Sequence, residues 1–166
     1  IFSSVPNIGG KASCQEDYKA FEINRSSQVM NWSAATMESY LQDLAEAEKE
    51  GRNLMTEKYA RMMKSTSPAE YAAIEHHLPP VDNESLSIID NIVGIVLAWE
   101  DALSKKYPNV FKKGRPLYSS GDSKYVTSLE TYLRGELATY SLRTLKLFYD
   151  DVAKQQTDNI NGSEII

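Results

Sequence analysis

The sequence predicts an all-α protein, a helical bundle built from two tandem repeats. Apolar residues recur at intervals of three and four, as on one face of a helix, whereas the alternation typical of a half-buried strand is nearly absent. Residues suited to helix N-caps separate these periodic stretches. Short motifs recur in the same order in the two halves of the chain. The length of 166 residues suits a single domain.

Two helices are predicted at the start of the chain. Ser13 and Glu16 form a capping box, in which each side chain bonds the other's backbone N–H, and this predicts a helix over roughly 13–31. Ser33 is the next candidate N-cap. The helix that follows it should end at Gly51, because glycine readily adopts the left-handed conformation that closes a helix.

Two more helices follow before the middle of the chain. Asn53 is expected to open the third helix, which carries apolar residues at helical spacing. Pro68 suits the first position of a fourth and shorter helix, and Glu70 completes its capping box. This short helix should stop before Pro79, since the residue that precedes a proline disfavours helical geometry.

The longest predicted helix begins at Asp82 or Asn83 and reaches roughly Lys106. Its middle, "IIDNIVGIVLAW", is apolar nearly all round, so we expect it to be the buried central helix. After a loop, Thr127 and Glu130 form another capping box. Two further ranges are then predicted to be helical, roughly 128–139 and 142–156.

The two halves share a motif. The stretch "ESYL" from Glu38 matches "ETYL" from Glu130, 92 positions later. We interpret this as a tandem duplication, with Tyr40 and Leu41 equivalent to Tyr132 and Leu133 as core positions and the halves related by a pseudo-two-fold axis. The first helix of repeat one is expected to be missing. The predicted parts of the single domain are repeat one over 1–81, repeat two over 82–158 and a loose tail over 159–166.

Charge and cysteine usage narrow the classes of partner. The net charge of -5 argues against nucleic acid or an anionic membrane surface, since both need a basic footprint. The longest apolar run, Ile92 to Trp99, is too short to span a bilayer. A single cysteine, Cys14, excludes an intramolecular disulfide, and we expect a cytoplasmic location.

Cys14 is the candidate nucleophile. It lies in the stretch "GGKASCQED", in the first turn of a predicted helix, where the helix dipole lowers the pKa of a thiol. A cysteine nucleophile needs a base, and His76 and His77 are the only histidines. The alternatives are a small buried cysteine and histidines that interact with a helix C-terminus. Gly10 also offers backbone N–H groups for an anion.

A polar group forms the candidate ligand site. Arg25, Ser27 and Gln28 belong to "RSSQ", and a second serine pair that includes Ser120 occurs in the other half. A pocket on the axis between the halves would bring these residues together. The alternative is that they occupy helix ends and caps, where such residues are common.

The last candidates are two carboxylates, and no metal-binding pattern accompanies them. Glu38 and Glu130 could face each other across the axis as paired carboxylates, or each could serve the first turn of its own helix. Adjacent histidines do not share a helical face, and no Glu-x-x-His pattern is present, so neither a metal nor another cofactor is predicted.

Several stretches together resemble a bacterial family catalogued as domain of unknown function forty-one twenty-five: "GGKASCQED", "INRSSQ", "ESYLQDL", "GRNLMTEKYARMM" and "LETYLRGEL". The resemblance implies a helix ahead of the glycine pair, and it implies no activity. The positions that match the family's motifs, and that we consider first as site candidates, are Gly10, Cys14, Gln15, Asp17, Arg25, Ser27 and Gln28. All of these except Cys14 are ligand-binding candidates.

These observations lead to one main expectation and two alternatives. We expect a cytoplasmic bacterial protein that binds a small molecule or a protein partner, with a homodimer as one arrangement that the sequence allows. The first alternative is a small-molecule hydrolase or transferase that uses Cys14 as its nucleophile. The second is a purely structural subunit of an oligomer.

Overall fold

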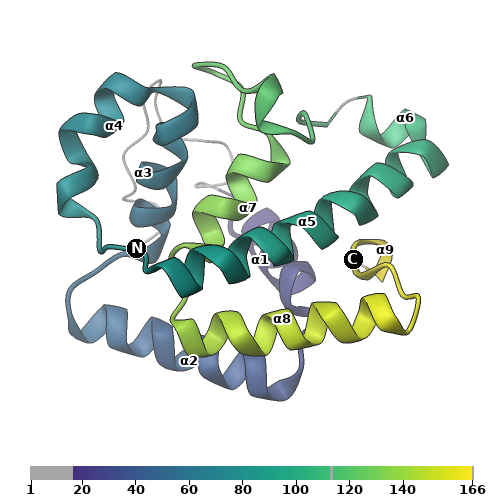
Figure 1. Cartoon of the computed structure of the whole chain (residues 1–166), viewed down its shortest axis with the longest axis horizontal. Helices are drawn as coiled ribbons and strands as arrows, with labels where there is room; N and C mark the ends of the chain where they lie inside the picture. Colours follow the sequence, from purple (N-terminus) through teal and green to yellow (C-terminus); the bar gives the residue numbers. More distant parts are fainter. Residues whose placement is uncertain (1–16, 113, 166) are drawn as a thin grey trace.

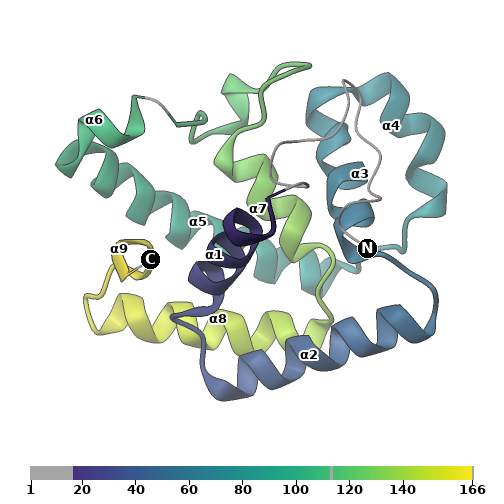
Figure 2. The ribbon, with the colours of Figure 1, turned by 180° about the vertical axis from the view of Figure 1, so that it is seen from behind.

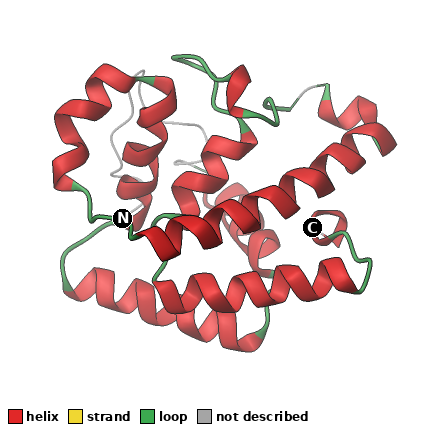
Figure 3. Cartoon of the chain, in the orientation of Figure 1, coloured by secondary structure: helices red, strands yellow, loops and turns green. Residues whose placement is uncertain are grey.

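The computed structural model describes residues 17–112 and 114–165, and this part of the chain is helical (Figure 3). It contains no β-strand in these ranges, where one isolated bridge pairs Ser123 with Val126. The prediction of an all-α protein is therefore confirmed. Among the described helices, none is long and apolar enough to cross a membrane.

The helices follow one another through short connections (Figure 1). The first half contains α1 (Tyr18–Val29), α2 (Ala34–Lys49), α3 (Leu54–Thr66), α4 (Pro68–Ile74) and the 3-10 helix η3 (Glu75–His77). The second half contains α5 (Asn83–Lys106), α6 (Pro108–Phe111), η4 (Ser119–Gly121), α7 (Leu129–Leu137), α8 (Leu142–Thr157) and α9 (Gly162–Ile165).

Most of the predicted helix starts agree with the observed caps. Side-chain oxygens of Ser33, Asn53 and Asp82 accept hydrogen bonds from the first turns of α2, α3 and α5. The first described helix differs, because Asp17 is its N-cap and accepts from the N–H of Ala20 at 2.9 Å. The predicted capping box of Ser13 and Glu16 lies outside the described residues.

The predicted box of Thr127 and Glu130 is wrong. The N-cap of α7 is Ser128, whose hydroxyl accepts from the N–H of Thr131 at 3.1 Å. The Glu130 carboxylate instead accepts from the N–H of Ser119 at 2.8 Å, so it ties η4 to α7. A serine one residue further along has the same capping chemistry as threonine, and sequence pattern alone does not separate the two.

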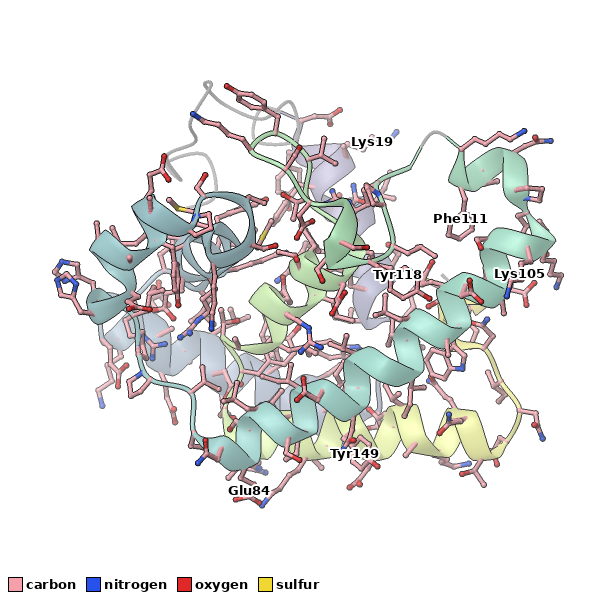
Figure 4. The ribbon with its side chains drawn as sticks, turned by 45° about the horizontal axis from the view of Figure 1, so that its top comes forward. Lys19, Glu84, Lys105, Phe111, Tyr118 and Tyr149 are labelled. Carbon is pink, nitrogen blue, oxygen red and sulfur yellow. The ribbon has the colours of Figure 1, made fainter. Side chains whose placement is uncertain are left out.

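Helix α5 contributes one buried face to the core, but it is not buried all round as predicted, because Gly94 and Ala98 in its middle are exposed. Ile89, Ile92, Val93 and Leu97 are in the core, and α5 contacts both α7 and α8 (Figure 1). Its ends carry charges that suit the helix dipole, with Glu84 in the first turn and Lys105 in the last (Figure 4). The expected loose tail contains α9, which packs against α5.

Helices α2 and α8 lie side by side and contact each other reciprocally (Figures 1 and 2). The Asp151 carboxylate accepts from the N–H of Ser33, the N-cap of α2, at 2.8 Å. The Asp43 carboxylate accepts from the N–H of Ser141, the N-cap of α8, at 3.0 Å. Ser33 and Ser141 are 108 positions apart, as are Asp43 and Asp151.

The aromatic core between these helices follows the same spacing. The ring centroids of Trp32 and Phe148 are 5.1 Å apart, and those of Tyr140 and Tyr40 are 4.8 Å apart. Trp32 and Tyr140, like Tyr40 and Phe148, are again separated by 108 positions. The contacts thus relate α2 to α8, whereas the motif spacing of 92 relates α2 to α7.

The predicted equivalence of Leu41 and Leu133 as core positions is wrong. Leu41 is 63% exposed, whereas Leu133 is partly buried against the core. Tyr40 is buried, but the ring of Tyr132 is partly buried beside the ammonium group of Lys58. Short motif identity therefore does not predict equivalent burial in this chain.

Candidate functional site

Three charged side chains from three helices meet inside the molecule. Arg25 comes from α1, Lys58 from α3 and Glu136 from α7, and Figure 2 shows α1 in front of α7. Arg25 Nη1 donates to Glu136 Oε1 at 2.9 Å, and Lys58 Nζ lies 2.5 Å from Glu136 Oε2. The side chains of Lys58 and Glu136 are 1% and 8% exposed, and that of Arg25 is 26% exposed. We call these three residues the ion cluster.

The Lys58–Glu136 contact has the distance of an ion pair but does not have hydrogen-bond angles, so neither Lys58 Nζ nor Glu136 Oε2 has a hydrogen-bond partner in the described chain. The ammonium group also lies 3.4 Å from the ring centroid of Tyr132, a cation–π contact. A buried ammonium carries three N–H donors. Lys58 is therefore held by charge and by an aromatic face.

The charges of the ion cluster do not balance. It contains two cations and one carboxylate, and Glu136 is the only carboxylate ion-paired with either cation among the residues described. An isolated charge in a protein interior is strongly unfavourable unless a group of opposite sign compensates it. Among the residues described, the cluster thus retains one uncompensated positive charge.

The protonation equilibria of the surrounding groups reflect this charge. Burial alone would raise the pKa of Glu136, but Lys58 and Arg25 outweigh it and hold that pKa below its ordinary value. Burial raises the pKa of Tyr40 to about 12, although Arg25 opposes the shift. Burial also raises the pKa of Tyr140 well above its ordinary value. Both phenols are therefore neutral hydrogen-bond donors at neutral pH.

A groove of about 570 Å³ lies over Arg25, between α1 and α2. Its lining is mostly apolar and includes Trp32, Leu41 and Leu44, with Arg25, Tyr40 and Tyr140 as polar members. We call this hollow the α1–α2 groove.

Arg25 has unused donors in this groove. Its Nη1 group donates to Gln28 and Glu136 at 2.7 and 2.9 Å, and its Nη2 group donates to the Tyr40 hydroxyl oxygen at 2.9 Å. A guanidinium carries five N–H donors. The Nε–H and the second Nη2 hydrogen of Arg25 therefore have no acceptor among the described residues. The Tyr40 O–H is likewise not used as a donor there.

A second hollow of about 880 Å³ lies among α3, α4, α7 and the start of α5. Arg61, Lys64, His76, Glu130 and Arg134 are among the residues that line it. We call it the α3–α7 cavity. Gly135 of α7 also lines it, at the point where α7 crosses α3: a Cβ on Gly135 would lie 3.0 Å from the backbone oxygen of Lys58.

The structure brings together part of the predicted ligand group. Arg25 and Gln28 share the α1–α2 groove and a hydrogen bond. Ser27 does not join this group. Its hydroxyl donates to backbone oxygens of its own helix, and it does not line the groove. Asp17 is the N-cap of α1. Gly10, Cys14 and Gln15 lie outside the described residues.

The remaining predicted residues are dispersed. Glu38 is exposed on α2, whereas Glu130 receives hydrogen bonds from Ser119 and Arg134, so the structure does not pair the two carboxylates. Ser120 lies in η4 and does not line the groove that contains Arg25.

The rings of His76 and His77 contact each other in a tilted arrangement, with centroids 3.9 Å apart, at the end of η3. His76 lines the α3–α7 cavity. Cys14, the predicted nucleophile, lies outside the described residues. Within the described ranges, no group of three or more His, Cys, Asp or Glu side chains has a geometry that could hold a metal ion.

Sequence reasoning missed Lys58 and Glu136. A signal for both was present in the helical periodicity. Lys58 lies midway between Leu54 and Met62 on one face of α3, and Glu136 belongs to the apolar stripe of α7 that continues to Leu137. Opposite charges on the apolar faces of two helices predict a buried ion pair, although not which helices meet.

The fold and site define an all-helical protein with a buried ion cluster beneath an apolar groove. The chain belongs to the family described as Protein of unknown function (DUF4125), whose model matches residues 1–166. The resemblance noted in the sequence is thereby confirmed. Neither a curated protein nor a solved structure matches the chain.

Proposed function

We propose that the protein binds a small molecule in the α1–α2 groove, and that this molecule is a carboxylic acid with an apolar body. The observation that carries the proposal is the uncompensated positive charge of the ion cluster. A carboxylate beside Arg25 would neutralise that charge, and guanidinium and carboxylate groups have matching hydrogen-bond geometry.

The polar residues of the groove suit an acidic head group. Arg25 offers its Nε–H and one Nη2 hydrogen, and Tyr40 offers its O–H. The burial that raises the pKa of Tyr40 keeps its phenol protonated, so that it donates to a carboxylate and does not repel it. An amine ligand would meet the same positive charge and would be excluded.

The apolar lining suits the body of such a ligand. Met37, Leu41 and Leu44 of α2 line the groove and are exposed. Exposed apolar side chains that gather at a hollow are typical of binding surfaces. A volume of about 570 Å³ falls in the range of small-molecule sites. We favour a small molecule over a protein partner because the unused donors of Arg25 lie in a hollow.

The proposal also includes a cellular location, a source organism class and an internal duplication. The single cysteine supports a cytoplasmic location, and the resemblance to a bacterial family supports a bacterial source. The reciprocal contacts of α2 and α8 support an internal duplication with a spacing of 108. The cysteine-dependent enzyme and the homodimer both stay predictions.

The proposal is tested by titrating the protein with ligands that share one chain and differ in head group. Trp32 lines the groove, so its fluorescence reports binding there, and calorimetry gives the affinity. Decanoate should bind more tightly than decanol, and decyltrimethylammonium should not bind. Affinity should rise about three- to fourfold for each added methylene of the carboxylate, because each buried methylene contributes about 0.8 kcal/mol.

Leu41 supplies a matched pair of variants, because its exposure allows substitution without loss of folding. Leu41→Glu and Leu41→Lys both remove the apolar side chain, but they place opposite charges in the groove lining. Leu41→Lys should bind decanoate roughly three- to tenfold more tightly than Leu41→Glu. Equal affinities, or equal binding of decanoate and decanol by the unmodified protein, would contradict the proposal.

A further inference from the structure

The α3–α7 cavity contains a cation, Arg61, that has no counter-ion in the described ranges of the chain. Arg61 Nη2 donates to the backbone oxygen of Pro79 at 2.7 Å. Arg61 Nε is buried and has no hydrogen-bond partner in the described structure. No carboxylate of the described chain forms an ion pair with this guanidinium, although a cation that loses water normally acquires one.

The nearest source of negative charge is already in use. Glu57 favours the charged form of Arg61, but both of its carboxylate oxygens accept hydrogen bonds from Arg52, at 2.8 and 2.9 Å. Burial therefore dominates and lowers the pKa of Arg61. A lowered pKa means that the folded protein holds this charge at a free-energy cost, which a bound anion would offset.

A second free cation lies one helical turn further along α3. Lys64 is exposed, lines the same cavity and forms no ion pair with the part of the chain described. Residues three apart on a helix are neighbours, so Arg61 and Lys64 can contact one ligand group together.

The other charged groups of the lining are mostly matched. Arg134 is paired with Asp90 and Glu130, at 2.6 and 3.1 Å. Glu75 also lines the cavity and carries a negative charge that an anion would avoid. The free cations are thus concentrated on the α3 side, and the anionic part of a ligand is expected there.

The wall formed by the chain between η3 and α5 is apolar. Leu78, Pro79 and Pro80 line the cavity, and Leu86 and Ile89 of α5 extend this surface. Two prolines restrict the backbone, so the wall is expected to be preformed. The cavity therefore offers two cations on one side and a fixed apolar surface on another.

The geometry points to a second ligand site, independent of the α1–α2 groove, that binds a phosphate monoester of an apolar or aromatic alcohol. A phosphate dianion matches two free cations, whereas a carboxylate or a sulfate ester matches one. Arginine binds two oxygens of a phosphate through its planar fork, and lysine contributes a mobile point charge. The alcohol part would lie against the apolar wall.

The test compares phenyl phosphate with phenyl sulfate, which has the same ring but one negative charge fewer at neutral pH. Calorimetry at low and constant ionic strength gives the affinities, and backbone amide NMR shifts locate the ligand. Phenyl phosphate should bind at least about tenfold more tightly than phenyl sulfate, because the sulfate ester loses one charge-assisted contact. Inorganic phosphate should bind more weakly than phenyl phosphate because it lacks the ring.

Two variants and one control assign the site. Arg61→Gln should weaken phenyl phosphate binding about tenfold or more, and Lys64→Gln about threefold, because Lys64 is exposed. Lys49→Gln is the matched control, since Lys49 is an exposed lysine of α2 outside both hollows, and binding should not change.

Lys64→Gln keeps the test decisive even if Arg61→Gln affects folding. Equal affinities for the phosphate and sulfate esters would overturn the proposal, as would equal weakening by Lys64→Gln and Lys49→Gln. Absence of phenyl phosphate binding would overturn it as well. None of these results would affect the binding of decanoate in the groove, so the two proposals fail independently.

Discussion

The α1–α2 groove and the α3–α7 cavity both contain arginine, but the two arginines are bound in different ways. In the groove, Arg25 is tied to a buried carboxylate and belongs to a cluster that joins three helices. In the cavity, Arg61 contacts a single backbone oxygen and has no ion pair among the described residues. The groove thus lies above a charge cluster that is part of the core, whereas the cavity is lined by two cations, Arg61 and Lys64, that form no ion pair with the described chain.

The largest expected effect separates the two sites by stability. Glu136→Gln leaves the buried Lys58 and the partly buried Arg25 without a carboxylate, so the free energy of unfolding should fall by about 3–5 kcal/mol. Arg61→Gln loses one hydrogen bond but also relieves the burial of a charge, and it should change stability by about 1 kcal/mol or less. Denaturant unfolding of both variants measures the difference. Similar losses in the two variants would remove the distinction.

The pH dependence of unfolding also measures the contribution of Glu136 to stability. The pKa of Glu136 is lower in the folded protein than its ordinary value of 4.5, so the unfolded chain binds the proton more tightly. This carboxylate therefore contributes stability above about pH 4.5, and the contribution is lost as the pH falls further through the folded pKa. Unfolding free energies measured between neutral and acidic pH should fall less steeply for Glu136→Gln. Parallel curves would show that the ion cluster does not set acid stability.

Gly135 tests how closely the two sites are joined. A Cβ at this position would lie 2.8 Å from Met62 Cγ and 3.0 Å from the backbone oxygen of Lys58, so Gly135→Ala must move α7 away from α3. The expected loss of stability is about 1–3 kcal/mol, typical of overpacking. Both decanoate and phenyl phosphate should bind more weakly to this variant. A variant of unchanged stability would mean that α3 and α7 adjust freely at their crossing.

Small effects are expected at the reciprocal caps of α2 and α8. Asp151 accepts from the N–H of Ser33 and from the Thr36 hydroxyl, whereas Asp43 accepts only from the Ser141 N–H among the described donors. Asp151→Asn and Asp43→Asn should each cost about 1 kcal/mol, with the larger loss at Asp151. Thermal unfolding of the two variants is sufficient. Phenyl phosphate binding should not weaken in either variant, because neither aspartate lines the α3–α7 cavity, and weaker binding would contradict this prediction.

Local signals in the sequence predicted the helices well, and long-range signals were missed. The caps at Ser33, Asn53 and Asp82 follow from chemistry within one helical turn. The buried face of α5 follows from the apolar run in its own sequence. The pairing of Lys58 with Glu136 depends on which helices cross, and no short stretch contains that information.

The candidate site was predicted in part for the same reason. Arg25 and Gln28 lie one turn apart on α1, so their proximity follows from helical geometry. Arg61 was not singled out, because a helical arginine is normally solvated or paired, and its isolation is visible only once the surrounding helices are in place. The motif spacing of 92 also suggested a different relation of the halves from the spacing of 108 seen in the contacts.

The most direct test of the central claim, the surplus positive charge beneath the groove, is the binding of decanoate and decanol to Lys58→Met. Lys58 is buried and does not line the groove, and its replacement leaves Arg25 paired with Glu136 one to one. The preference of the groove for decanoate over decanol should fall about tenfold, because the substitution removes the surplus positive charge of the ion cluster. An unchanged preference in a folded Lys58→Met variant would contradict the account.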